Sequence, residues 1–169
     1  MRIGLIAYSF ALRETEPNPC DVRLAQAVER IVKEEVEKGN EVIVIAQWEV
    51  ALALSIEPAL VVREHRQKGA YLDSEEVTSQ AIPIFEGYRI TEVIPVANPF
   101  LHLFKCRKLV RSAGLTPLRR RIGWIGFDKD SLQWYTRGPA HLLVYTALQV
   151  SVGYRGKHID VDRNNKLAR

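Results

Sequence analysis

The chain has 169 residues and a formal net charge of +4, and 47% of its residues are hydrophobic. This length forms one domain with a substantial core that needs no support from disulfides or metals, and the composition is that of a soluble globular protein. No apolar run is long enough to span a membrane, and the N-terminal segment is too short and too quickly charged for a secretory signal, so we expect a cytoplasmic protein.

The two cysteines, Cys20 and Cys106, have neither a CxxC partner nor a metal-type spacing. We therefore expect no disulfide framework and no metal site, and two free thiols fit a reducing compartment. The positive charge is local, because residues 96–127 contain seven basic residues and no acidic one. A local excess of this kind favours an anionic ligand over a general nucleic-acid surface.

Residues 3–10 form a short apolar run that predicts a buried first strand. Asn18 or Asp21 then caps a predicted helix over residues 22–39, in which apolar residues recur at helical spacing. Residues 42–46 predict the second strand. The order strand, helix, strand indicates a parallel crossover, and so a doubly wound sheet or one close to it.

The apolar run 50–56 predicts a helix packed on the sheet, which Pro58 interrupts. Residues 60–62 predict a brief edge strand, and residues 65–70 a polar loop. These shorter elements lie between the second strand and the next well-marked helix.

A second capped helix is predicted over residues 74–88, with Asp73 or Ser74 as the cap and acidic residues in its first turn. Pro83 should kink this helix or shorten it. Residues 93–97 then form an apolar block of the kind that a parallel strand shows when both of its faces are covered. We expect this central strand to lead directly into the basic part of the chain.

Asn98 and Pro99 should end the central strand and start a helix that runs to about Ser112 and closes at Gly114. A helix that starts there would place unpaired amide groups and the positive end of its dipole at the carboxyl edge of the sheet. That edge is where α/β proteins bind ligands.

Residues 122–127 predict a further short strand, and residues 140–152 a final apolar helix laid across the sheet. Together these elements predict one three-layer, Rossmann-like α/β domain over residues 1–155, with a mainly parallel sheet of about five strands. Residues 156–169 form a polar tail that we expect to be flexible.

Several common catalytic motifs are missing from the sequence. The chain has no GxGxxG after the first strand, no GxxxxGK[ST], no HExxH and no GxSxG. It therefore lacks the dinucleotide fingerprint, the P-loop, the zinc-protease helix and the nucleophile elbow. No particular cofactor is indicated.

Three segments, taken in order, resemble the DUF218 or YdcF-like family of small Rossmann-like proteins. They are residues 71–78 (YLDSEEVT), residues 96–102 (VANPFLH) and residues 128–137 (DKDSLQWYTR). The first resembles the family's segment before its central helix, the second its strand that ends in a small polar residue and a histidine, and the third its polar loop near the C-terminus. Because most members lack an assigned reaction, the resemblance implies a fold and no detailed activity.

His102 is the first candidate for the site, since the first turn of a helix after the central strand could turn its side chain toward a ligand. The helix N-terminus would keep this imidazole neutral; the alternative is a histidine packed between helix and loop. Lys105 lies one turn later and is the better anion contact. Arg107, Lys108 and Arg111 are expected to belong in part to a solvated basic stripe.

Other candidates follow the predicted strands. Glu49 and Glu76 each start a helix, where a carboxylate acts as a base or, alternatively, only complements the dipole. Ser9 follows the first strand, where phosphate-binding loops begin. Asn98 follows the central strand, with simple capping as its alternative role.

Trp134, with Gln133 and Arg137, could wall a pocket for a flat ring, or Trp134 could simply cover the core. The candidate catalytic residues are His102 and Glu49, and the candidate ligand-binding residues are Ser9, Gln47, Ser74, Asn98, Lys105, Gln133, Trp134 and Arg137.

The sequence therefore predicts a protein that binds an anionic or nucleotide-like small molecule where the first, second and central strands end. If it is an enzyme, transfer or hydrolysis at a phosphate-bearing ligand is the most natural reaction. The alternative is a non-catalytic interaction module, such as a homodimer formed through the basic helix. Nucleic-acid binding ranks third, because the triplet Arg119–Arg121 would alternate between the faces of a strand.

Overall fold

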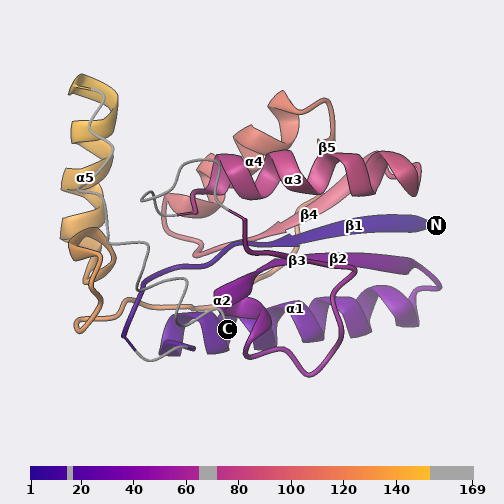
Figure 1. The fold of residues 1–169 in the computed structure, drawn as a ribbon, viewed down its shortest axis with the longest axis horizontal. Coiled ribbons are helices and arrows are strands. Elements are labelled where there is room, and N and C mark those ends of the chain that lie inside the picture. The colour runs from indigo at the N-terminus through magenta and orange to yellow at the C-terminus, as the bar shows by residue number, and fades with distance from the viewer. Residues whose placement is uncertain (15–16, 65–71, 153–169) are drawn as a thin grey trace.

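The computed structural model of the chain describes residues 1–14, 17–64 and 72–152. Helices and strands alternate and build a three-layer α/β fold around one parallel sheet, which confirms the predicted fold class (Figure 1). The predicted loop 65–70 and the predicted tail 156–169 lie outside the described residues. The elements are β1 (Arg2–Ala7), α1 (Pro19–Glu37), β2 (Glu41–Gln47), α2 (Trp48–Ala51), β3 (Leu60–Val62), α3 (Ser74–Gly87), β4 (Glu92–Val96), α4 (His102–Ser112), β5 (Thr116–Pro117), η1 (Trp134–Thr136) and α5 (Pro139–Val152).

The sheet has five strands in the order β3-β2-β1-β4-β5. In the described residues every pairing is parallel, and Ile6 of β1 lies in register with Ile45 of β2 and Pro95 of β4. From β1 the chain continues to β2, which lies on one side of β1 in the sheet. From β4 it continues to β5, which lies in the opposite direction. The carboxyl ends of β1 and β4 therefore form the switch point at which open α/β sheets hold their ligands.

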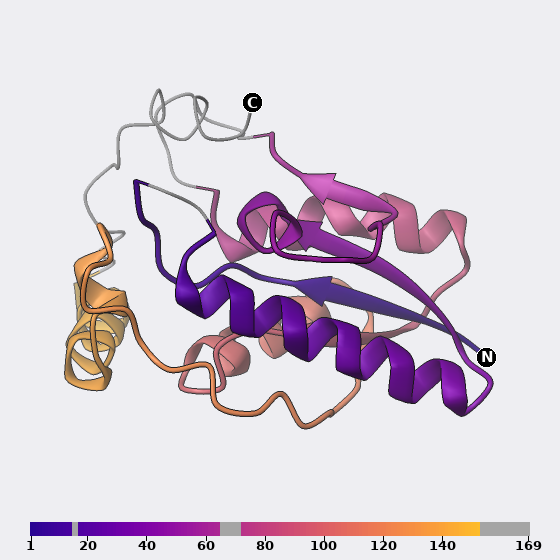
Figure 2. The ribbon, with the colours of Figure 1, turned by 90° about the horizontal axis from the view of Figure 1, so that it is seen from below.

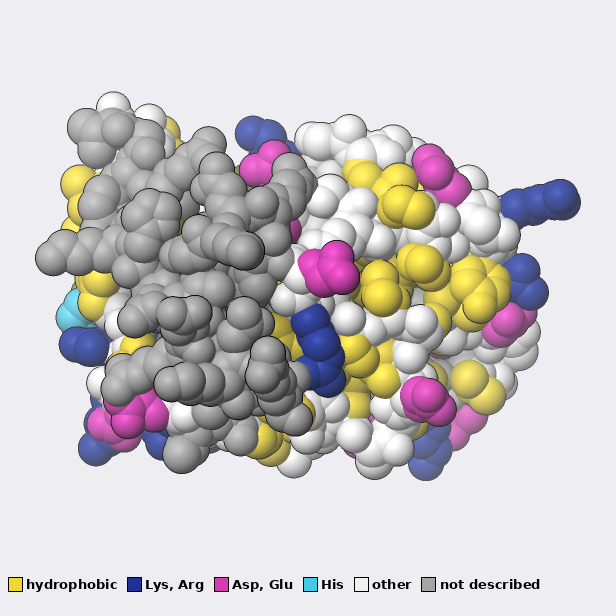
Figure 3. Space-filling model, in the orientation of Figure 1, with side chains coloured by type: hydrophobic (Ala, Val, Ile, Leu, Met, Phe, Trp, Pro, Cys, Tyr) yellow, Lys and Arg dark blue, Asp and Glu magenta, His cyan; other side chains and the backbone are white. Residues whose placement is uncertain are grey.

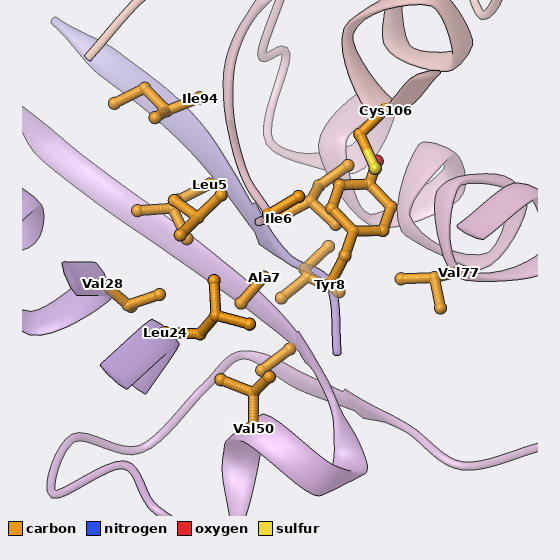
Figure 4. Packing of buried hydrophobic residues seen from close by; sticks show 14 of the residues in the cluster. Leu5, Ile6, Ala7, Tyr8, Leu24, Val28, Val50, Val77, Ile94 and Cys106 are labelled. Atoms are coloured by element: carbon orange, nitrogen blue, oxygen red, sulfur yellow. The ribbon is translucent and has the colours of Figure 1, made fainter. Parts of the chain in front are cut away.

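Helix α1 covers one face of the sheet, and α3 and α4 cover the other (Figures 1 and 2). Because strand side chains alternate between faces, β1 supplies both layers of the core. Figure 4 shows Leu5 and Ala7 on the side of α1, while Ile6 and Tyr8 lie on the side of Val77 and Cys106. All the labelled side chains of β1 are fully buried, so this strand lies at the centre of the core.

The caps of α1 and α3 follow from their sequences. Oδ1 of Asn18 accepts the amides of Cys20 and Asp21 at 2.9 and 3.0 Å, so Asn18 is the N-cap of α1. Asp73 caps α3 in a capping box with Glu76, whose side chain accepts the Asp73 amide in return. Helix α3 continues through Pro83 to Gly87, so its predicted extent is nearly confirmed.

Two predicted elements are wrong. The helix expected over 50–56 is replaced by the four-residue α2, after which Ala53 and Leu54 form tighter turns. The strand expected over 122–127 is irregular, and the edge strand is instead the short β5. Gly123 and Gly126 interrupt the extended backbone, because they adopt φ values of +91° and +79°.

Side chains of other elements donate hydrogen bonds to the carbonyl groups of this irregular segment. In a regular sheet, the amides of a neighbouring strand would donate to these carbonyls instead. Three side chains on α1 and after β4 hold it against the domain. The bonds run from Arg30 Nη2 to the carbonyls of Arg121 (2.5 Å) and Ile122 (3.2 Å), from Arg23 Nη1 to Ile125 (2.9 Å), and from Asn98 Nδ2 to Gly126 (2.7 Å).

Helix α5 does not lie across the sheet as predicted. It stands beyond the carboxyl ends of the strands, roughly perpendicular to them, and packs on η1 (Figures 1 and 2). The rings of Tyr135 and Tyr145 stack at 4.0 Å between centroids. Figure 3 shows hydrophobic side chains at the left edge of the molecule, over α5, where Leu143 and Val144 are exposed. In the part of the chain that the structure describes, no helix is both long and apolar enough to cross a membrane.

Candidate functional site

A pocket of about 340 Å³ lies between the carboxyl edge of the sheet and α5. Its wall is mainly apolar, and it is built from parts of the chain that are far apart in sequence. The lining comes from the ends of β1 and β2, the start of α3, the first two turns of α4, the segment 133–136 and one face of α5. The pocket therefore lies at the switch point, where a ligand site is expected in this class of fold.

Ser9 and Gln47 lie in the pocket wall at the ends of β1 and β2. The Ser9 amide donates to Oε1 of Gln47 at 3.0 Å, and Nε2 of Gln47 donates to the Leu72 carbonyl at 3.2 Å. Ser9 Oγ donates to Oδ2 of Asp21 at 3.0 Å. These bonds join the two strand ends to α1 and to the start of α3, and so fix the shape of this side of the pocket.

Ser74 and His102 face each other across the start of α3 and α4. Ser74 Oγ and His102 Nε2 are hydrogen-bonded at 2.9 Å, and both residues line the pocket. The imidazole also packs against Phe10, with 5.7 Å between ring centroids. The structure thus brings together two predicted site residues that are 28 positions apart.

Burial, and to a smaller extent the positive charge of Lys105, lowers the pKa of His102 from 6.5 to about 3. The imidazole is therefore neutral at physiological pH, although the main cause is desolvation and not the helix N-terminus. His102 as a whole is partly exposed, yet its Nδ1 is buried and has no hydrogen-bond partner among the described residues. This nitrogen is one of the polar groups that a ligand could satisfy.

Lys105 and Lys108 are exposed side chains of α4 that line the pocket. Lys105 is the predicted anion contact, and Lys108 was assigned to a solvated stripe. In the described lining the one acidic residue is Asp73, whose carboxylate caps α3 through the amides of Glu75 and Glu76. Positive charge therefore dominates the mouth of the pocket.

Gln133 also lines the pocket and is only 3% exposed. Its Nε2 is buried without a hydrogen-bond partner in the described part of the chain. The neighbouring candidates do not reach the pocket. Trp134 packs against Tyr145, and Nε of Arg137 donates to the Ser131 carbonyl at 2.8 Å. Of these three predicted residues, the structure therefore brings one into the site.

Asn98 is a structural residue outside the pocket lining. Helix α4 begins at His102 and not at Asn98, so its predicted start is wrong. Oδ1 of Asn98 accepts the Phe100 amide at 2.9 Å, and its carbonyl accepts the Leu103 amide at 2.9 Å. The amides of Phe100 and Leu103 therefore already donate to Asn98 and are not available to an anion. The predicted cluster of free amides at this helix start is not found in the described chain.

Glu49 lies outside the pocket lining as well, and it is fully buried on α2. It contacts the pocket residue Gln47, whose Nε2 donates to Oε1 of Glu49 at 3.4 Å. Because Glu49 does not line the pocket, the geometry gives no support for a direct catalytic role of this carboxylate.

Part of the wall was not foreseen from the sequence. Leu142 and Tyr145 of α5, together with Phe104 of α4, line the pocket. An apolar helix is usually core, and no local pattern indicates that α5 stands off the sheet edge. The described residues contain no group of three or more His, Cys, Asp or Glu side chains that could hold a metal ion.

Comparisons with known proteins add no identity to this geometry. No protein-family model matches the sequence, and a search of curated proteins found no match. The resemblance to the DUF218 family stays a prediction.

Proposed function

We propose that the protein binds an anionic small molecule in the pocket between the sheet edge and α5, as a Rossmann-like ligand-binding protein of the DUF218 type. The observation that carries this proposal is the pair Lys105 and Lys108 at the mouth of a mainly apolar pocket. Opposite charge attracts an anion to the mouth, and low-dielectric walls strengthen that attraction.

His102 contributes as a hydrogen-bonding group in this proposal. An imidazole whose pKa is about 3 is a weak proton acceptor near pH 7, since a general base works best when its pKa lies near the operating pH. Its bond to Ser74 holds the ring in one orientation. Binding, without transfer or hydrolysis, is therefore the function that the site supports best. The homodimer and nucleic-acid alternatives stay predictions.

The test is a thermal-shift titration with inorganic phosphate, AMP, acetate and octyl phosphate. A ligand at a hundred times its Kd stabilises the native state by about 2.7 kcal/mol. We expect the anions that bind to lose this stabilisation in the double variant Lys105→Ala/Lys108→Ala. The matched control is Lys33→Ala/Lys129→Ala, which removes two exposed charges outside the pocket lining.

Equal stabilisation of the wild type and the pocket double variant would show that the anions bind elsewhere. A wild type that no anion stabilises would contradict the proposal directly. Added salt should also weaken binding, because the lysines are exposed and their field is screened.

A further inference from the structure

We infer that the ligand is an amphipathic anion: a carboxylate or phosphate head group on an apolar aliphatic or aromatic body. The inference rests on the proposed function and narrows its ligand class. Two features of the described lining carry it. The buried polar atoms that lack partners are hydrogen-bond donors, and most of the remaining wall is apolar.

The groups around the Ser74 hydroxyl favour one tautomer of the neutral His102 ring. Near Ser74 Oγ lie the ring nitrogen His102 Nε2, at 2.9 Å, and the thiol of Cys106, which keeps its hydrogen because burial raises its pKa to about 12. An imidazole nitrogen is a much stronger acceptor than a thiol sulfur. We therefore assign the Ser74 hydroxyl as the donor to His102 Nε2.

With Nε2 acting as acceptor, the neutral imidazole carries its hydrogen on Nδ1. That N–H is the buried group of His102 without a partner among the described residues. A buried donor left unpaired costs about 1–3 kcal/mol, so a ligand atom that accepts from it gains affinity. His102 therefore selects an acceptor.

Gln133 presents a second donor of the same kind. The Gln133 amide nitrogen of the backbone donates to Ser131 Oγ at 3.1 Å, which fixes the residue beside η1. The side-chain Nε2 is then buried in the pocket wall without an acceptor in the described chain. Two unmet donors and two lysines favour a group that only accepts, and carboxylates and phosphates are such groups.

The rest of the wall favours an apolar body. Phe10, Leu72, Leu142 and Val150 line the pocket, and Tyr145 stacks on Tyr135 beside them. Burial of apolar ligand surface here stabilises the complex by about 25 cal/mol per Å². The hydroxyls of a ribose would instead lose water against these side chains, which disfavours a nucleotide.

Isothermal titration calorimetry of the full chain tests the inference, with octyl phosphate and octanoate as probes below their micelle concentrations. Inorganic phosphate, AMP and octanol are the comparison ligands. We expect one of the two amphiphiles to bind at least tenfold more tightly than all three comparison ligands. The better of the two identifies the head group.

The possible outcomes separate this inference from the proposed function. If AMP or inorganic phosphate binds at least as tightly as both amphiphiles, the amphipathic class is wrong while anion binding stands. If octanol binds as tightly as the amphiphiles, the head group has no role and the inference fails. If no anion binds, both proposals fail.

Two variants locate the site. Gln133→Glu replaces the donor by a negative acceptor and should weaken amphiphile binding at least tenfold, while Gln26→Glu on the exposed side of α1 should not. Leu142→Trp fills the apolar wall and should remove amphiphile binding, while Leu148→Trp, outside the lining, should keep it. Unchanged binding in both Gln133→Glu and Leu142→Trp would overturn the assignment of this pocket, and thermal unfolding verifies that each variant is folded.

Discussion

The carboxylate of Glu35 should stabilise the fold by holding the segment after β5 against α1. Glu35 is fully buried near the end of α1, and its two oxygens accept from Nε and Nη2 of Arg120 at 2.7 and 3.2 Å. Lys38 and Asn40 donate to the same carboxylate at 2.7 and 2.8 Å. Replacing Glu35 by Gln keeps the size of the side chain but removes the charge that these donors need.

The magnitude follows from the pKa of Glu35. This pKa is lowered from 4.5 to about 2, mainly by the hydrogen bond from Arg120 and also by those from Lys38 and Asn40, while burial opposes the change. A change of that size corresponds to roughly 3 kcal/mol. Because the Lys38 side chain is 55% exposed, solvent screens part of the interaction, and we expect a loss of about 2 kcal/mol for Glu35→Gln.

The sign of the pH dependence is fixed by the direction of the shift. A carboxylate with a depressed pKa stabilises the folded state fully above pH 4.5, and this contribution is lost as the pH falls toward 2. Urea unfolding of wild type and Glu35→Gln at pH 7 and pH 3 should therefore show a difference that shrinks by more than half at pH 3. Glu37→Gln, an exposed change on the same helix, is the control. A difference that is equal at both pH values would refute the ionic origin.

Three further predictions concern the core and a cap. Burial raises the pKa of both Cys20 and Cys106 to about 12, so a maleimide at pH 8 should label neither thiol in the folded protein and both in denaturant; rapid labelling of the native state would contradict their burial. Gly4→Ala places a Cβ 2.8 Å from the ring of Phe85 and should cost about 1–3 kcal/mol in urea unfolding, whereas an unchanged midpoint would indicate a looser core. Asp73→Ala removes the capping box of α3 and should cost about 1 kcal/mol, again measured with urea; no loss would show that the cap is replaced by water.

The fold brings six of the predicted site residues together in one pocket. Ser9, Gln47, Ser74, His102 and Lys105 all line one pocket, because parallel strands bring their carboxyl ends to the same edge. Gln133 joins them through a long irregular segment whose path no local signal describes.

The failures of the site prediction share a physical cause. Asn98 and Glu49 follow strands, as ligand residues often do, but their polar groups bond to the chain itself. Capping and ligand binding use the same side chains, so a sequence pattern cannot distinguish them.

Local chemistry was enough to predict the layered architecture. The alternation of short apolar runs with amphipathic helices, the cap at Asn18 and the capping box at Asp73 depend on neighbours only a few residues away. The parallel sheet follows from that alternation, because a strand, a helix and a further strand pack compactly in few other ways.

Contacts between distant residues set the position of α5, the path of residues 118–133 and the orientation of the His102 ring. An apolar helix has the same sequence character whether it covers a sheet or walls a pocket, since burial alone selects its residues. The bond between Ser74 and His102 forms only when α3 and α4 pack side by side, and so does the buried ring nitrogen that has no partner among the described residues. The pocket is therefore a property of tertiary packing.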